Sequence, residues 1–199
     1  MGAMTSAAAD AQAVLDFWFG AEDSATHGAQ RAEWFAKDDA FDRSIVDRFG
    51  ALIERALRGE LDGWASEPRS GLARILLLDQ FTRNAFRGTP RAFAGDSQAL
   101  AAASALVGSR HDEQLPPFMS AFVYLPFEHA ENPAMQDQAV RLFIRLAAAD
   151  PSLATMLDYA HKHRAVIERF GRFPHRNAIL GRQSTAEEIA FLGQPGSSF

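Results

Sequence analysis

The residues best suited to chemistry gather in one stretch, residues 161–182. This stretch holds three histidines, one lysine and five arginines against a single acid, Glu168. It therefore carries a formal charge of about +5, in a chain whose net charge is −5. So many cationic donors in one place imply either an anion to be bound or carboxylates of the same chain to be paired.

Four further polar residues continue apolar stripes on expected helices. Asp79 and Arg83 share one core-facing stripe at i, i+4 spacing, His129 projects from a second stripe, and His163 from a third. Burying several charges is costly unless they satisfy one another or a ligand. We therefore expect the four side chains to be largely buried in one connected region, which is either a polar pocket or a purely structural network.

Simpler interpretations stand beside the functional ones. A single histidine on an apolar face is usually a core residue bonded to a carbonyl, and Asp79 with Arg83 is equally compatible with a structural pair. His129, Glu131 and His163 or His175 are suitable metal ligands but lack a diagnostic spacing. No serine or threonine lies in a nucleophile motif, and no phosphate-binding glycine loop is present. The sequence predicts neither a metal nor a cofactor.

A turn after residue 170 is expected to hold several of the cations in place. Gly171 suits a helix C-cap, and Phe173-Pro174 favours an extended backbone before a short apolar helix at residues 178–180. Arginines on such a turn can grip carboxylate or phosphate with two hydrogen bonds. The alternative is that they link helices by pairing with acids elsewhere in the chain, namely Asp79, Asp96, Glu128 or Glu131.

The elements that position these residues are predicted to be helical throughout. Apolar periodicity is that of helices, and no segment alternates as a strand does. With 199 residues, we expect residues 1–9 to be a disordered opening and residues 10–199 to be a single helical domain. Helices are expected from Asp10 to Phe19, from Asp38 or Asp39 to Gly59, from Pro68 through Phe81, from an Asp96 cap to Val107, from Pro116 or Pro117 through a kink at Pro126, from Pro133 to Ala149, after Asp150-Pro151, and from a capping box at residues 184–187 to Leu192.

Composition narrows the function classes. The chain has no cysteine, which excludes disulfides and thiolate chemistry, and no apolar run long enough for a membrane helix. We expect a cytoplasmic protein without a membrane partner. The acidic balance makes nucleic acid an unlikely partner, because nucleic-acid binders are usually basic. The oligomeric state is not predicted.

Long motifs resemble the uncharacterised bacterial family called domain of unknown function 924. The resemblance implies an all-helical, tetratricopeptide-like array without regular repeats and without an established activity. In two places the chain departs from the family pattern, with Thr82 in place of proline and Ala130 in place of serine; neither change removes an ionisable group. The motifs that carry the resemblance are VLDFWFG, the WF pair at 34–35, and the segments LLLDQFTRNAFRGTPRAFAGD, FVYLPFEHAENPAMQDQ and HRAVIERFGRFPHRNAILGRQSTAEEIAFL.

These observations predict a site that binds a small anionic metabolite, with or without its turnover. The alternative is a helical scaffold that binds a protein or peptide in its groove. The catalytic candidates are His129, Glu131 and His163. The ligand-binding candidates are Asp79, Arg83, Asn84, Arg87, Tyr124, Arg172, His175, Arg176 and Asn177.

Overall fold

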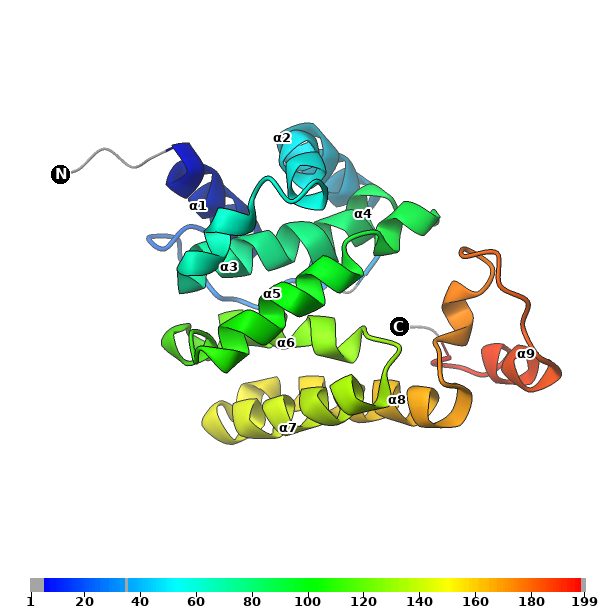
Figure 1. Cartoon of the computed structure of the whole chain (residues 1–199). Coiled ribbons are helices and arrows are strands. Elements are labelled where there is room, and N and C mark those ends of the chain that lie inside the picture. The colour runs from blue at the N-terminus through cyan, green and yellow to red at the C-terminus, as the bar shows by residue number, and fades with distance from the viewer. Residues whose placement is uncertain (1–5, 35, 198–199) are drawn as a thin grey trace. The chain divides into compact units, whose positions relative to one another are not determined.

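All of the regular elements are helical. The computed structural model describes residues 6–34 and 36–197, and within them no strand is present (Figure 1). The predicted all-α class is therefore confirmed. Among the described residues, no helix is both long and apolar enough to cross a membrane.

The chain divides into two compact units, and each is described on its own. Unit 1 comprises Met1–Arg87 and Arg91–Pro126, and unit 2 comprises Gly88–Pro90 and Phe127–Phe199. The boundary between them falls at Pro126, a residue that cannot donate a helical hydrogen bond. The expectation of one domain over residues 10–199 stays a prediction.

Unit 1 contains the first five helices and most of the sixth. Its α-helices are α1 (Ser6–Phe19), α2 (Asp39–Leu57), α3 (Pro68–Ile75), α4 (Thr82–Ala85), α5 (Asp96–Gly108) and α6 (Pro117–Glu128), which ends in unit 2. A π-helix over Leu76–Phe81 joins α3 to α4.

The start of α1 corrects the prediction for the N-terminus. The helix begins at Ser6, so residues 6–9 are helical although they were expected to be disordered. Three consecutive alanines follow Ser6, and alanine has the highest helix propensity. Residues 1–5, and Phe35 of the WF pair, lie outside the described residues.

Aromatic packing forms the core of unit 1. Trp18 of α1 stacks on Trp34 at a centroid distance of 6.0 Å and meets Phe122 of α6 edge-on at 5.7 Å. Asp38 caps α2 by accepting hydrogen bonds from the backbone at Ala40 and Phe41, as expected. The same helix then contributes a buried apolar stripe, formed by Phe41, Ile45, Phe49, Ile53 and Ala56.

Glycine at position 95 allows α5 to approach the π-helix closely. A Cβ atom on Gly95 would overlap the carbonyl oxygen of Leu78, so no other residue fits without a backbone shift. Gly95 is also the N-cap residue of α5 and makes no side-chain cap. The predicted Asp96 cap is thus wrong by one residue, because the Asp96 carboxylate binds Arg83 instead.

Unit 2 is a helical hairpin followed by a shorter helix. It contains α7 (Pro133–Ala149), α8 (Ala154–Phe170) and α9 (Ala186–Leu192), and α7 lies alongside α8 (Figure 1). Asn132 caps α7 and the left-handed Gly171, with φ of 69°, ends α8 as predicted. Val166, Ile167 and Phe173 form a buried apolar cluster in this unit.

Two local predictions in unit 2 need correction. The capping box of α9 pairs Thr185 with Glu188, one residue later than expected. Residues 178–180 form a turn, and the short helix lies earlier, as a 3-10 turn at Pro174–Arg176. Proline fixes its own φ near the helical value, which explains why this turn starts at Pro174. The tetratricopeptide-like arrangement stays a prediction.

Candidate functional site

Asp79 lies in the middle of the π-helix and is fully buried. Its carboxylate is 3.1 Å from Nη1 of Arg83, and Gln80 donates a hydrogen bond to it. Nη1 of Arg83 also donates to the backbone carbonyl of Asp79, at 2.6 Å. The i, i+4 pair expected from the sequence therefore forms, and it gives a buried carboxylate the partner that it needs.

Arg83 bridges the π-helix to the start of α5. Its Nη1 is 2.9 Å from Oδ1 of Asp96, and its Nη2 donates to Oδ2 of the same residue at 3.2 Å. Burial alone would lower the pKa of the Arg83 guanidinium, but Asp79 and Asp96 outweigh burial and raise it. Arg83 is thus held between two carboxylates of unit 1.

Asn84 and Arg87 meet a third carboxylate of unit 1, Asp42 of α2. Asn84 donates to Oδ1 of Asp42 at 2.7 Å, and Arg87 donates to both oxygens at 2.7 and 3.0 Å. Burial raises the pKa of Asp42, but the hydrogen bonds from Arg87 and Asn84 outweigh it and lower this pKa overall. These contacts tie α4 to α2.

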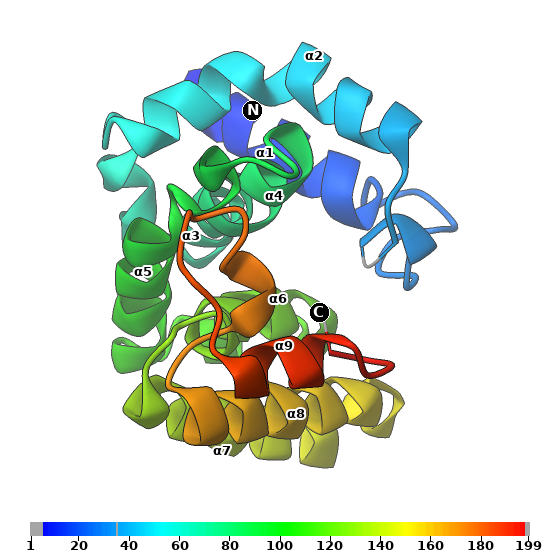
Figure 2. The ribbon, with the colours of Figure 1, turned by 90° about the vertical axis from the view of Figure 1, so that its right-hand side faces the viewer.

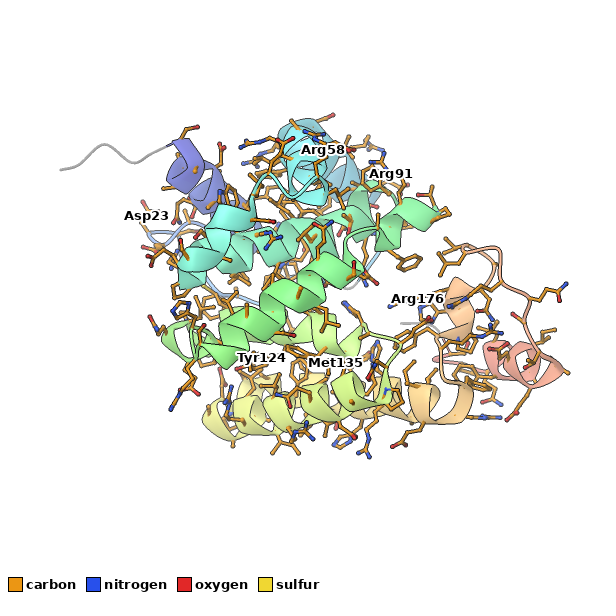
Figure 3. The ribbon with its side chains drawn as sticks, viewed as in Figure 1. Asp23, Arg58, Arg91, Tyr124, Met135 and Arg176 are labelled. Carbon is orange, nitrogen blue, oxygen red and sulfur yellow. The ribbon has the colours of Figure 1, made fainter. Side chains whose placement is uncertain are left out.

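Tyr124 of α6, labelled in Figure 3, contacts another buried acid of unit 1. Its hydroxyl donates to Oδ2 of Asp112 at 2.7 Å, and Ser120 donates to the backbone carbonyl of the same residue at 2.8 Å. The ligand-binding candidates of unit 1 therefore all contact side chains of their own unit.

In unit 2, Glu131 holds the turn that follows α8. It accepts two hydrogen bonds from Arg182, at 2.7 and 2.9 Å, and one from the backbone N–H of Phe173 at 2.7 Å. Burial raises the pKa of Glu131, while these donors outweigh burial and lower it. The contacts of Glu131 are those of a clamp, and a catalytic role for it stays a prediction.

A second clamp joins the turn to α9. Arg172 donates two hydrogen bonds to Glu188, at 2.7 and 2.9 Å, and Asn177 donates a third at 3.3 Å. Glu188 also accepts from the backbone N–H of Thr185 in the capping box. The hydrogen bonds from Arg172 are the main reason that the pKa of Glu188 falls to about 2.

Around Phe173 the turn, α8 and the residues after α6 bring five side chains together. The ring of Phe173 lies 5.5 Å from that of His163, 5.6 Å from that of His175, and 4.6 Å beneath the guanidinium of Arg176. His163 and His129 have ring centroids 6.3 Å apart, and Arg176 donates to the carbonyl of His129 at 3.0 Å. We call these five residues the Phe173 cluster; Figure 3 labels Arg176.

The electrostatic environment of the Phe173 cluster is positive at His175. The pKa of His175 falls from its ordinary 6.5 to about 4, first because the ring is desolvated and then because Arg176, His163 and His129 disfavour a further positive charge. Glu131 acts in the opposite direction and does not compensate.

A buried carboxylate holds one of the histidines of the Phe173 cluster. Oε1 of Glu128 lies 2.9 Å from Nδ1 of His163, and the same nitrogen is 2.9 Å from the carbonyl oxygen of Tyr159. Because both neighbours are oxygens, Nδ1 must carry the hydrogen. These two oxygens orient the imidazole ring, as the carboxylate does in other carboxylate–imidazole pairs.

The predicted site residues thus fall into two sets. Asp79, Arg83, Asn84, Arg87 and Tyr124 lie in unit 1, and the remaining candidates lie in unit 2. Asp79 and His163 are buried as expected, while Arg83 and His129 are half-buried. Their meeting in one shared region, which would involve both units, stays a prediction.

Sequence reasoning missed Glu128 and Phe173 as members of the site. Glu128 ends an otherwise apolar helix, and a charge on such a helix needs a buried partner, which was the available signal. For Phe173 the sequence offers only its place between Arg172 and Pro174. Within residues 6–34 and 36–197, no group of three or more histidines or acids is arranged to hold a metal ion.

Comparisons with known proteins place the chain in a family. Residues 14–196 match the family model described as bacterial protein of unknown function, DUF924. A solved structure of a protein of unknown function, ATU0120 from Agrobacterium tumefaciens, is similar at 42% identity and a TM-score of 0.84, over 94% of this chain and 99% of that one. No curated protein matches the sequence. Because the family model matches almost the entire chain, this protein belongs to the bacterial DUF924 family.

Proposed function

We propose that this protein binds a small anionic metabolite at the Phe173 cluster of unit 2. One observation supports the proposal above all: the contacts form a closed ring, from Phe173 to His163, His129, Arg176 and back to Phe173. The guanidinium of Arg176 and two imidazoles thus lie around the Phe173 ring, and the third imidazole, His129, lies beside His163. An anion placed among them removes the repulsion between these groups.

The chemistry of His175 supports the same proposal. Burial is the first cause of the low pKa of His175, and the positive charge of Arg176 is the second; this second cause also favours an anion close by. His129 and His175 are half-buried, so the cluster is accessible from solvent through these two residues. A small anion is therefore a better match than an extended polymer.

His163 gives the site a group for turnover. Glu128 and the carbonyl of Tyr159 orient its imidazole ring, as the carboxylate does in carboxylate–imidazole pairs that act as general bases. Turnover of the ligand therefore depends on His163 in this proposal.

Thermal unfolding with inorganic phosphate and citrate, at fixed ionic strength, tests the proposal. A ligand at about 100 times its Kd stabilises the native state by about 2.7 kcal/mol, which raises the Tm of a chain of this size by roughly 5 to 10 °C. We expect this rise in the parent, its loss in His163→Gln, and roughly half of it in Arg176→Lys, because a tenfold weaker Kd leaves about 1.4 kcal/mol of the stabilisation. His129→Gln should keep most of the affinity if the histidine only binds, but lose any turnover if it also transfers protons.

His161→Gln is the matched control, because His161 is exposed on the same helix two residues before His163. It should leave the rise in Tm unchanged. If neither anion shifts the Tm of the parent, or if His161→Gln and His163→Gln lose the shift equally, the proposed site is wrong.

A second candidate, binding of a peptide, is favoured by a groove of about 240 Å³ that residues of α8 and α9 line; Figure 2 shows the ribbons of these two helices. Its lining is mainly apolar and includes two cations, Lys162 and Arg169. Arg169 already donates to Glu187 at 2.8 and 2.9 Å, so Lys162 is the cation that would meet an acidic residue of a peptide. The apolar lining comprises Ala165, Val166, Phe170 and Phe191.

Selection of displayed peptides against the parent, with counter-selection against Ala165→Trp, tests this second candidate. Ala165→Trp fills the groove without changing the Phe173 cluster. We expect enriched peptides to pair an apolar residue with an acid. Peptides that bind the variant equally well would exclude the groove. We also propose a cytoplasmic location, as expected from the sequence, and cell fractionation would test it.

A further inference from the structure

Glu128 has one carboxylate oxygen that its own protein does not satisfy. The residue is only 3% exposed, and its Oε1 faces His163. Its Oε2 is buried and has no hydrogen-bond partner among residues 6–34 and 36–197. A buried acceptor without a donor costs free energy, and for a charged group the cost is larger. Such an atom therefore indicates a donor that comes from outside the chain.

His163 is not that donor. Its Nδ1 hydrogen is already directed at Oε1 of Glu128 and at the carbonyl of Tyr159. A single N–H group shared by two oxygens has nothing left for a third. The second oxygen of Glu128 thus stays available for a ligand even while the Glu128–His163 contact is intact.

Gln136 of α7, whose side chain contacts the backbone of Glu128, also has a buried side-chain oxygen without a hydrogen-bond partner among the described residues. Its Nε2 donates to the backbone carbonyls of Glu128, at 2.7 Å, and Ala130, at 2.8 Å. Because both partners are acceptors, the amide cannot be turned around, and Oε1 is the atom left over. This oxygen is also buried and has no hydrogen-bond partner among the described residues. The segment therefore presents two acceptor oxygens, one of them charged.

We propose that Glu128 makes the Phe173 cluster select a zwitterion, with an ammonium group beside its anionic group. The inference rests on the proposed anion site. The anionic group is held by Arg176 and the imidazoles, and the ammonium group donates to Oε2 of Glu128. These two places are adjacent, because His163 contacts both Glu128 and the Phe173 ring that Arg176 covers. An amino acid or an aminoalkyl phosphate has this chemistry.

A simple anion is a poorer ligand for physical reasons. It leaves Oε2 of Glu128 without a donor, and it brings a second negative charge close to a buried carboxylate. A simple amine satisfies Glu128 but meets the positive charge of Arg176, which is the second cause, after burial, of the lowered pKa of His175. Only a ligand with both charges satisfies both sides of the site.

Matched pairs of probes, measured by titration calorimetry at pH 7, test the inference. The pairs are glycine with acetate, β-alanine with propionate, γ-aminobutyrate with butyrate, and phosphoethanolamine with ethyl phosphate. We expect at least one zwitterion to bind about tenfold or more tightly than its partner, because a charge-assisted hydrogen bond to a buried carboxylate accounts for at least that factor.

Glu128→Gln supplies the second arm. It keeps the shape of the side chain and removes the charge, so the preference for the zwitterion should fall to below about threefold while the simple anion binds as well as before or better. Glu168→Gln is the control, because Glu168 is an exposed acid of α8. It should keep the full preference. If Glu128→Gln does not fold, the comparison of paired probes on the parent still decides.

The outcomes separate this inference from the proposed function. Simple anions that bind the parent as tightly as every zwitterion would overturn the role of Glu128 and leave the anion site intact. A preference that persists in Glu128→Gln would also overturn it. The absence of binding by all eight probes and by inorganic phosphate would overturn both proposals.

Discussion

Two groups of polar residues, one in each unit, were equally prominent in the sequence and proved to be organised differently. In unit 1, Arg83 lies between Asp79 and Asp96, and Arg87 binds Asp42. Each cation there meets a carboxylate. In the Phe173 cluster of unit 2, two imidazoles and a guanidinium lie around one aromatic ring, and the third imidazole, His129, lies beside His163.

The difference teaches that residue type and helical phase do not separate structure from function. A buried arginine beside carboxylates is what a stable helical packing needs, because the opposite charges compensate the loss of hydration. In the Phe173 cluster the cationic and ionisable groups outnumber the carboxylates Glu128 and Glu131 beside them, and we propose that a bound anion completes the balance. The sign of the neighbouring charges is therefore the useful criterion, and it requires the fold.

The largest expected effect comes from breaking the balanced set of unit 1. Asp79→Ala removes the more deeply buried of the two carboxylates that hold Arg83 and leaves only Asp96, so it should cost up to about 3 to 5 kcal/mol of the free energy of unfolding, as the breaking of a buried pair does. Urea unfolding measures the loss. Asp42→Ala is the control, since its partner Arg87 is partly exposed and the cost should be clearly smaller. A loss below about 1 kcal/mol for Asp79→Ala would contradict the balanced arrangement.

A pH dependence of comparable size should come from His175 in the Phe173 cluster. Its pKa is about 4 in the native state and 6.5 as an ordinary value, so the unfolded state binds the proton first as the pH falls. The part of the free energy of unfolding that depends on His175 is therefore at its full value above pH 6.5. It decreases by about 3 kcal/mol in total toward pH 4, of which about 2 kcal/mol is lost between pH 7 and pH 5.

His175→Gln removes the titration and should flatten the stability curve between pH 7 and pH 5. The charged groups that lower the native pKa are Arg176, His163 and His129, and Glu131 opposes them. The acids Glu131 and Glu188 also have lowered pKa values, so by the same linkage they too lose their contribution as the pH falls, but only at lower pH, below their ordinary pKa of 4.5. An equally steep curve in His175→Gln would show that another group is responsible.

Unit 2 also contains pairs of opposite charge, and two neighbouring acids test whether burial decides how much such a pair stabilises the protein. Glu188 is buried and binds Arg172, while Glu187 is exposed and binds Arg169. Glu188→Gln should cost about 1.5 to 3 kcal/mol, because charge-assisted hydrogen bonds to a buried acid are lost. Glu187→Gln should cost less than about 1 kcal/mol, because both partners are solvated. Equal losses in chemical unfolding would show that burial does not decide the value of these pairs.

Much of the fold could be predicted because its signals are local. The Asp38 cap, proline at the start of α7 and glycine at the end of α8 each act within a few residues of their own position, and each was placed correctly. Errors arose where tertiary contacts compete with local rules. Asp96 binds Arg83 instead of capping α5, and the close approach of Gly95 to Leu78 belongs to packing alone.

The sequence was enough to select residues of the candidate site, but it did not predict which acid each of them contacts. His163 and Arg176 were selected from their types and spacing, and they do lie on a common ring. Their partners come from distant parts of the chain: Glu128 is 35 residues before His163, and Arg182 reaches back to Glu131. No local periodicity encodes which acid meets which cation, so only the structure could show that Glu128, and not Glu131, lies beside His163.

The smallest expected effect distinguishes a cation of unit 1 from a cation of the Phe173 cluster. Arg87 was a ligand-binding candidate, but it is 39% exposed and donates both of its observed hydrogen bonds to Asp42. Arg87→Gln should therefore cost at most about 1 kcal/mol of stability, since exposed ion pairs contribute little and Asn84 still holds Asp42. It should also leave the affinity for inorganic phosphate within about twofold of the parent, whereas Arg176→Lys should lower it by about tenfold, because a lysine cannot reproduce the planar fork of donors. Calorimetric titration of both variants measures the contrast. A tenfold loss in Arg87→Gln would place an anion-binding cation in unit 1 and break the distinction between the two groups.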